Sequence, residues 1–146
     1  MQKLNFPSYT FRLKSNENKT LIFDIIRKKY VVLTPEEWVR QHTIFYLIKE
    51  KKYPISLIAV EKQLKINSVI KRTDIVVFNT DGTPEILVEC KSPSVVISQD
   101  TFDQIARYNL TVKSNYLIVT NGLNHYYCQI DVEKENYVFL NDIPNY

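Results

Sequence analysis

The sequence predicts an α/β fold in which a mixed β-sheet is flanked by helices. A helical pattern beginning at residue 34 precedes apolar runs that alternate in the manner of strands between residues 56 and 91. A second helical pattern, over about 98–113, leads directly into a compact apolar run at 116–120. Short turns favour antiparallel pairing, whereas a helix between two strands is typical of a parallel crossover. The order of patterns therefore predicts both kinds of pairing in one sheet.

The first 33 residues show no helical period. Strands are predicted at 9–14, 20–26 and 30–33, with a turn at 16–18 that is rich in Asn. We expect this segment to form a strand extension that packs on a core over residues 34–132.

The first helix has a well-marked start. Thr34 is a favourable N-cap, Pro35 suits the first helical position, and Glu37 completes a capping box. The helix is expected to run to about residue 50, where Lys side chains suit the C-terminal dipole. Its predicted apolar face consists of Trp38, Gln41, Ile44, Phe45, Leu47 and Ile48.

Three strands are predicted to follow the first helix. Residues 56–66 alternate between apolar and polar side chains, and 69–78 form the next strand. The turn at 79–84 contains Asp, Gly and Pro, and the apolar run 85–91 follows it. The last two strands are therefore predicted to pair as a β-hairpin.

The second helix and the strands after it complete the predicted core. Ser98, Asp100 and Thr101 offer caps, and the apolar residues Phe102, Ile105, Ala106 and Leu110 recur at helical spacing. The compact strand 116–120 is followed by strands at 125–132 and 137–140. The length of 146 residues suits a single domain over 1–146.

Composition excludes several classes of protein. Two cysteines, Cys90 and Cys128, make neither a disulfide framework nor a zinc site, and His42 and His125 stand isolated. No signal peptide or transmembrane run is visible, so a cytoplasmic protein without a membrane partner is expected. The net charge of +3 is too small to predict nucleic-acid binding by itself, although basic clusters occur at 27–29, 49–52 and 71–72. Such clusters are more often solvated loop ends than binding sites.

Two carboxylates and a lysine are predicted to meet in the hairpin. Glu89 and Lys91 are two residues apart, so they point to the same face of a strand. If the two strands pair across the turn at Gly82, Asp74 and Glu89 are at similar distances from the turn, so they are expected to lie near each other. Mg²⁺ prefers one or two carboxylates plus waters, so a hard cation and a phosphate could meet here. The structural alternative is an ion pair at a strand end.

The motif Asp74, a fourteen-residue gap and Glu89-Cys90-Lys91 resembles that of the PD-(D/E)XK nuclease superfamily. The closer resemblance is to the N-terminal nuclease domain of type I restriction enzyme R subunits. The resembling motifs are, in order, Lys71-Arg72-Thr-Asp-Ile-Val, Val88-Glu-Cys-Lys-Ser-Pro93, Gln104-x-x-x-Tyr108-Asn and Val119-Thr-Asn-Gly122. The resemblance implies a restriction-endonuclease-like core.

The resemblance also implies roles for the site residues. Asp74, Glu89 and the carbonyl of Cys90 would hold Mg²⁺, with Mn²⁺ as a substitute, and Lys91 would orient the attacking water or stabilise the phosphate. Glu37 would be the acidic residue of the first helix that supports the metal site. Its structural alternative is the capping box alone. Glu36 and Glu61 are the other acids that could take that role, although Glu61 is more simply a solvated strand carboxylate.

Further residues are implied in DNA contact. Gln104 and Tyr108 lie four apart on one helix face, and the resemblance places them near the catalytic strand, where they would steady Lys91 or contact DNA. Arg107 would contact a phosphate. Arg72 would pair either with a carboxylate or with DNA, and the sequence leaves both open.

The predicted function is that of a metal-dependent DNA endonuclease domain of the restriction or defence type, a hydrolase of phosphodiester bonds. The chain contains no G-x-x-x-x-G-K-[ST] motif, so it cannot translocate DNA alone. The expected partners are DNA and either a second copy or a restriction-complex subunit. The alternatives are a non-catalytic nucleic-acid-binding or defence-associated module with the same fold, and a structural α/β protein.

Overall fold

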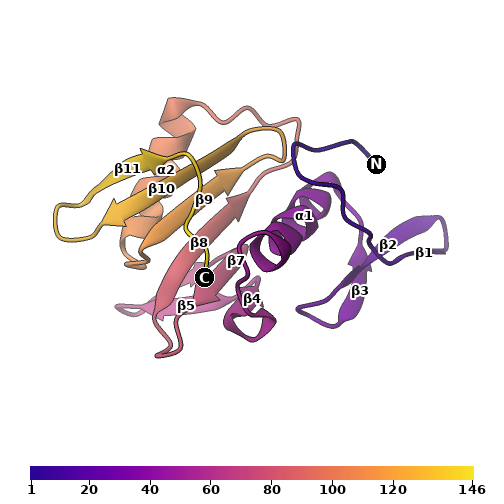
Figure 1. Cartoon of the computed structure of the whole chain (residues 1–146), viewed down its shortest axis with the longest axis horizontal. Coiled ribbons are helices and arrows are strands. Elements are labelled where there is room, and N and C mark those ends of the chain that lie inside the picture. Colours follow the sequence, from indigo (N-terminus) through magenta and orange to yellow (C-terminus); the bar gives the residue numbers. More distant parts are fainter.

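The computed structural model describes residues 1–146 and contains two helices and three sheets (Figure 1). The main sheet has six strands in the order β11-β10-β9-β8-β7-β4, and only the β8–β9 pair is parallel. Its strands are β4 (Ile58–Val60), β7 (Ile75–Phe78), β8 (Pro84–Cys90), β9 (Tyr116–Thr120), β10 (His125–Asp131) and β11 (Asn136–Leu140). The prediction of a mixed sheet is confirmed.

The two helices pack on opposite faces of this sheet. Along β8, the side chains of Ile86, Val88 and Cys90 belong to the core cluster that includes Val39, Ile44 and Leu47 of α1 (Pro35–Lys49). Leu87, between them, belongs to the cluster with Phe102 and Ala106 of α2 (Gln99–Leu110). Burial on both faces explains why the central strands are almost continuously apolar.

Both helices begin as predicted. The hydroxyl of Thr34 accepts a hydrogen bond from the Glu37 amide, and the hydroxyl of Ser98 accepts one from the Thr101 amide. The second helix ends at Leu110 rather than at about 113. Neither helix combines the length and the apolarity needed to span a membrane.

The predicted capping box on α1 is only half present. The Glu37 carboxylate does not return to the backbone of Thr34; it accepts hydrogen bonds from Arg27, Arg40 and Gln41. A bond between the carboxylate and a guanidinium joins two charged groups, whereas a bond to the backbone amide would join the carboxylate to a neutral donor. Tertiary ion pairs have therefore replaced the reciprocal cap.

The predicted apolar face of α1 also needs correction. Val39, Ile44 and Leu47 are fully buried in the core cluster that lies against the sheet, whereas Trp38 and Phe45 are half-buried. Trp38 and Phe45 pack against the ring of Phe11, which lies in the segment before the first strand, with ring-centroid distances of 5.1 and 4.7 Å. The helix is thus covered on nearly every side, and the prediction of one apolar face does not describe it.

The N-terminal strand extension forms a separate antiparallel sheet. Its strands are β1 (Leu13–Asn16), β2 (Lys19–Asp24) and β3 (Lys29–Val32). Figure 1 shows this sheet beyond α1, at the opposite end of the molecule from the β10–β11 turn. The first of these strands begins four residues later than predicted.

The two strands predicted at 56–66 and 69–78 are each broken. The first divides into a short 3₁₀ turn (Ile55–Leu57), β4 and β5 (Gln63–Ile66), and the second divides into β6 (Val69–Arg72) and β7. The breaks face each other, since the Glu61 amide donates to the Asp74 carbonyl (2.9 Å) and the Thr73 amide donates to the Lys62 carbonyl (3.0 Å). Strands β5 and β6 pair only with each other. Asp74 consequently stands at the break, immediately before β7, rather than inside a strand.

Candidate active site

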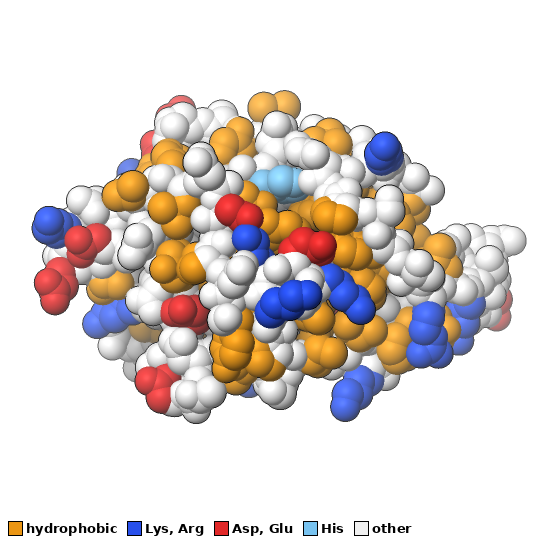
Figure 2. All heavy atoms as spheres, viewed as in Figure 1, with side chains coloured by type: hydrophobic (Ala, Val, Ile, Leu, Met, Phe, Trp, Pro, Cys, Tyr) orange, Lys and Arg blue, Asp and Glu red, His pale blue; other side chains and the backbone are white.

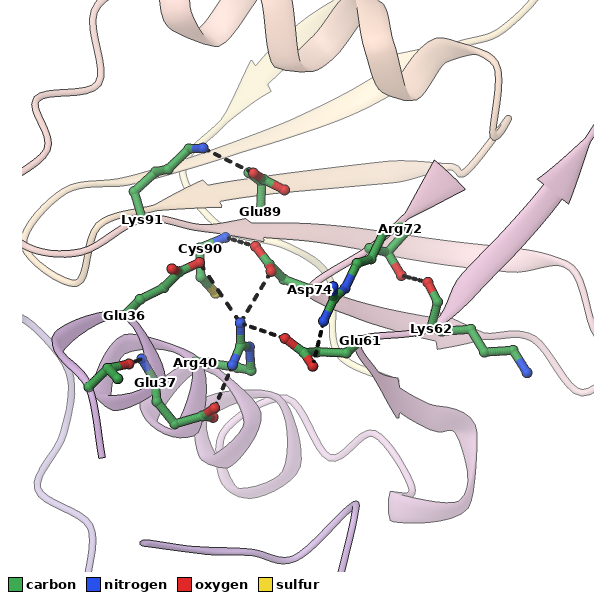
Figure 3. Close-up of polar contacts among 12 residues, drawn as sticks. Glu36, Glu37, Arg40, Glu61, Lys62, Arg72, Asp74, Glu89, Cys90 and Lys91 are labelled. Carbon is green, nitrogen blue, oxygen red and sulfur yellow. Dashed lines mark hydrogen bonds and ion pairs between the residues drawn. The ribbon is translucent and has the colours of Figure 1, made fainter. Parts of the chain in front are cut away.

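Asp74, Glu89 and Lys91 lie together where β7 begins and β8 ends (Figure 3). Ile75, the residue after Asp74, pairs with Val88, the residue before Glu89, so the two carboxylates stand at the same end of the β7–β8 pair. The Lys91 amide donates to the Thr120 carbonyl (2.8 Å), which continues the parallel ladder past β8. Lys91 Nζ lies 3.2 Å from Glu89 Oε1. The structure thus brings together three of the residues singled out in the sequence.

The Asp74 carboxylate is held from two sides. Its Oδ2 accepts a hydrogen bond from the Cys90 amide at 2.7 Å, and its Oδ1 lies 3.3 Å from Arg40 Nη2. The first contact comes from a strand backbone and the second from a buried side chain of α1. Both contacts fix the orientation of this carboxylate.

Glu89 has an unusual electrostatic environment. Burial and then the neighbouring charge of Asp74 raise the pKa of Glu89 to about 7, against the opposing effect of Lys91. Only 28% of its side chain is exposed. Negative charge is therefore crowded at this point and only partly compensated.

A network of arginines and carboxylates lies beside Asp74. Arg40, only 7% exposed, places Nη1 2.5 Å from Glu37 and Nη2 3.5 Å from Glu61 as well as 3.3 Å from Asp74. Burial by itself would lower the pKa of Arg40, but Glu37 and Asp74 raise it. A buried guanidinium of this kind stays charged because several carboxylates surround it.

Glu37 supports Arg40 and does not reach the Asp74–Glu89 pair. One of its oxygens accepts from Arg27 (2.9 Å) and Arg40 (2.5 Å), and the other accepts from Gln41 (3.0 Å). In Figure 3 the Arg40 side chain stands between Glu37 and Asp74. Glu37 therefore acts on Asp74 through the arginine.

The other two acids considered for this role also contact arginines. Glu61 lies in the break between β4 and β5, not in a strand, and pairs with Arg72 (2.8 Å), Arg27 (3.5 Å) and Arg40 (3.5 Å). These charges hold the pKa of Glu61 below its ordinary value, against the opposing effect of burial. Glu36 is more exposed and lies 3.8 Å from Arg40.

A hollow of about 310 Å³ opens next to Glu89 on the α2 side of the sheet. Its lining residues are Glu89, Arg72, Gln104, Tyr108, Ile105 and Asn109. The sequence predicted a role in the site for the first four of them. Lys71 Nζ lies 3.4 Å from the centroid of the Tyr108 ring and covers one of its faces. Gln104 forms no hydrogen bond with Lys91, so of the two roles predicted for it, steadying Lys91 or contacting DNA, only the second is left.

Arg107 stands apart from this hollow. It lines a different one with Asn67, Lys113 and Glu135. Arg72 makes the carboxylate contact that the sequence left open, through Glu61, while 64% of its side chain remains exposed.

Each histidine contacts a backbone carbonyl, and each cysteine lies in the core. His42 Nδ1 lies 2.8 Å from the Trp38 carbonyl, and His125 contacts Thr120 and the Asn5 carbonyl. Both cysteines are buried and free. No three His, Cys, Asp or Glu side chains are grouped to hold a metal ion.

Sequence reasoning missed Arg27 and Arg40. The available signal for Arg40 was its spacing of three and four residues from Glu37 and Glu36 on a predicted helix, which favours ion pairs. No helical spacing marks Arg27: Asp24 is close in the chain but lies in a predicted strand, and Glu37 and Glu61 are distant in the chain.

The comparison with protein families gives one match. Residues 35–144 match the family described as the type I restriction enzyme R protein N terminus. The matched range includes both helices and all strands of the main sheet, and it leaves out β1–β3. No match was found among curated proteins.

Proposed function

The chain belongs to the family of type I restriction enzyme R protein N termini, and on this premise we propose that it is a metal-dependent DNA endonuclease domain. It would hydrolyse phosphodiester bonds in restriction-type defence, in the cytoplasm. The observation that carries the proposal is the meeting of two carboxylates and a lysine at one end of the β7–β8 pair: Asp74 accepts from the Cys90 amide at 2.7 Å, next to Glu89, and Lys91 Nζ lies 3.2 Å from Glu89. The mixed sheet with a helix on each face supports a restriction-endonuclease-like core for residues 34–132.

The carboxylates fit a divalent cation. Asp74 and Glu89, together with the carbonyl of Cys90, would hold Mg²⁺, which prefers one or two carboxylates plus waters, and Mn²⁺ would substitute for it. The raised pKa of Glu89 reflects burial and the nearby charge of Asp74, and a divalent cation would relieve this crowding. When bound, the ion supplies a Lewis acid and lowers the pKa of an attacking water.

Lys91 has a role separate from metal binding. Its ammonium group can donate hydrogen bonds but cannot ligate a cation. In the proposal, Lys91 orients the attacking water or stabilises the charge that develops on the phosphate. Glu89, at 3.2 Å, keeps the ammonium group at the site.

DNA would lie against the α2 side of this site. Gln104, Tyr108 and Arg72 line the hollow beside Glu89, and in the proposal they contact the DNA strand. Arg107, on the same helix but outside the hollow, would contact a phosphate further along. Cutting both strands requires a second site, from a homodimer or from another subunit of a restriction complex.

A cleavage assay tests the proposal. Plasmid and oligonucleotide DNA are incubated with the protein in Mg²⁺, in Mn²⁺ and in EDTA. We expect cleavage with either cation and none in EDTA, and loss of cleavage in Asp74→Asn. Intact DNA under every condition would reject the catalytic assignment.

A non-catalytic DNA-binding module is the second candidate. The observation in its favour is that Arg40 already places a positive charge 3.3 Å from Asp74. If that charge takes the place of a cation, the protein binds DNA but not Mn²⁺. Retained DNA binding without metal binding would therefore favour this candidate.

A further inference from the structure

The N-terminal sheet has one strongly basic face. Residues 12–32 contain six Lys or Arg and two Asp or Glu, a net charge of +4, whereas the whole chain carries +3. The net charge of all the other residues is therefore −1. Figure 2 shows Lys and Arg side chains at the end of the molecule where Figure 1 places β1–β3.

Strand register places three of these six cations on the outer face of the sheet. Lys14 pairs with Leu21, Asn16 pairs with Lys19, and the Phe23 amide donates to the Arg12 carbonyl, so Arg12, Lys14 and Lys19 share one face. All three are exposed and none forms an ion pair with a carboxylate. Asp24 is buried on the opposite face, and Glu17 lies in the β1–β2 turn. The outer face thus presents cations without compensating acids.

Two aromatic rings hold two of these cations, Arg12 and Lys14, in place. The Arg12 guanidinium lies 4.2 Å from the centroid of the Phe23 ring, and Lys14 Nζ lies 4.2 Å from that of Tyr30. The rings pack edge to face at 5.2 Å. Cations that are already ordered lose less side-chain entropy on binding an anion. Since the cations cover the rings, this face suits phosphates better than stacked bases.

The sheet is also fixed relative to the candidate active site. Arg27, in the β2–β3 turn, contacts Asp24 at 2.6 Å, Glu37 at 2.9 Å and Glu61 at 3.5 Å. Glu37 and Glu61 in turn contact Arg40, which contacts Asp74. A continuous set of ion pairs therefore joins the basic sheet to the Asp74–Glu89 pair.

From these observations we propose that the outer face of β1–β3 binds the phosphate backbone of DNA, independently of base sequence. The inference deepens the proposed nuclease function by naming a DNA-binding surface outside the family-matched residues 35–144. Its occupant is double-stranded DNA, because ordered cations without acids complement a continuous line of phosphates.

Paired charge removal tests the inference. Arg12→Gln/Lys14→Gln is compared with Lys49→Gln/Lys134→Gln, which removes the same charge at two exposed, unpaired lysines outside this sheet. Affinity for a labelled duplex of mixed sequence is measured by fluorescence anisotropy in EDTA, over about 50–200 mM salt. We expect Arg12→Gln/Lys14→Gln to weaken binding about tenfold. The slope of the logarithm of affinity against the logarithm of salt concentration should become less steep by about 2 units, because each lost phosphate contact lowers it by roughly 0.9. The control pair should change both quantities much less.

Controls separate folding and catalysis from binding. Circular dichroism melting verifies that both double variants are folded, and Arg12→Lys/Lys14→Arg should restore the affinity. Equal weakening by the two double variants, or a wild-type protein that binds no DNA, would overturn the inference. A wild-type protein that binds DNA in EDTA but cuts none in Mg²⁺ or Mn²⁺ would reject the proposed nuclease function and leave the basic surface standing.

Discussion

A substitution of Lys91 tests, at the level of a single residue, whether metal binding and chemistry are separate. Because an ammonium group has no lone pair for a cation, Lys91→Ala should leave Mn²⁺ affinity unchanged or raise it. Cleavage should fall by roughly 10²-fold or more, the scale of losing one transition-state donor. The measurement is a single-turnover cleavage rate at saturating Mg²⁺. Full activity in this variant would reduce Lys91 to the ion-pair partner of Glu89.

Glu89 should lower the stability of the metal-free protein at alkaline pH. Its pKa in the folded protein, about 7, exceeds the ordinary glutamate value of 4.5, so the folded state binds the proton more tightly. The resulting stabilisation is present below about pH 4.5 and is lost as pH rises through 7. In EDTA, the free energy of unfolding of Glu89→Gln should therefore equal that of wild type near pH 5. At pH 8 it should exceed the wild-type value by roughly 1–3 kcal/mol.

Urea denaturation at the two pH values checks the Glu89 prediction. Glu133→Gln, at an exposed position in the β10–β11 turn, is the matched control. A difference between Glu89→Gln and wild type that is the same at both pH values would contradict the pKa assignment.

Single residues were predictable from sequence only where the partners lie close along the chain. The two-residue strand period and one turn place Asp74, Glu89 and Lys91 together. Arg40 escaped prediction because its guanidinium reaches from α1 to the start of β7, thirty-four positions away in sequence. Only the packing of the helix on the sheet shows that contact.

At the level of elements, α2 is expected to contribute Gln104 to the function and not to the fold. The Gln104 side chain is exposed, lines the hollow beside Glu89 and makes no hydrogen bond. Gln104→Ala should lower the cleavage rate while the free energy of unfolding stays within about 0.5 kcal/mol of wild type. Gln129→Ala, an exposed glutamine on β10, is the control for both measurements. A loss of stability in step with activity would show that Gln104 is structural.

The strand breaks show where element prediction fails. Neither Glu61-Lys62 nor Thr73-Asp74 contains Gly or Pro, so alternation alone predicts unbroken strands. In the structure Glu61 takes a positive φ of 52°, and Leu64 and Ile66 pack against the core cluster under α2. Packing of the β5–β6 hairpin on this cluster therefore bends the chain where the sequence alternation alone predicts continuous strands. The bend leaves Asp74 at a strand end.

At the scale of the whole molecule, one set of Asp74, Glu89 and Lys91 per chain predicts nicking before double-strand cleavage. Supercoiled plasmid should convert first to the nicked circle. Linear product should then rise more steeply than in proportion to protein concentration, because a second copy supplies the second cut. Agarose gels over a concentration series measure both products. Linear product without a nicked intermediate, in simple proportion to protein, would contradict a single cut per chain.

The distribution of charge was only partly predictable. Of the basic clusters in the sequence, Arg27 is tied into ion pairs, Lys71 covers the Tyr108 ring and Arg72 pairs with Glu61. The exposed cations Arg12 and Lys14 are separated in sequence, and strand pairing assembles them with Lys19. A charge run in sequence therefore says little about which cations remain free.

The most direct test of the whole account is a calorimetric titration of the protein with Mn²⁺ at pH 8, where Glu89 is ionised. We expect one bound ion per chain in wild type and in Lys91→Ala, and loss of that binding in both Asp74→Asn and Glu89→Gln. All four proteins must show the same folded circular dichroism spectrum. Binding by Asp74→Asn that equals wild type, or no binding by wild type, would contradict the claim that Asp74 and Glu89 share a catalytic cation.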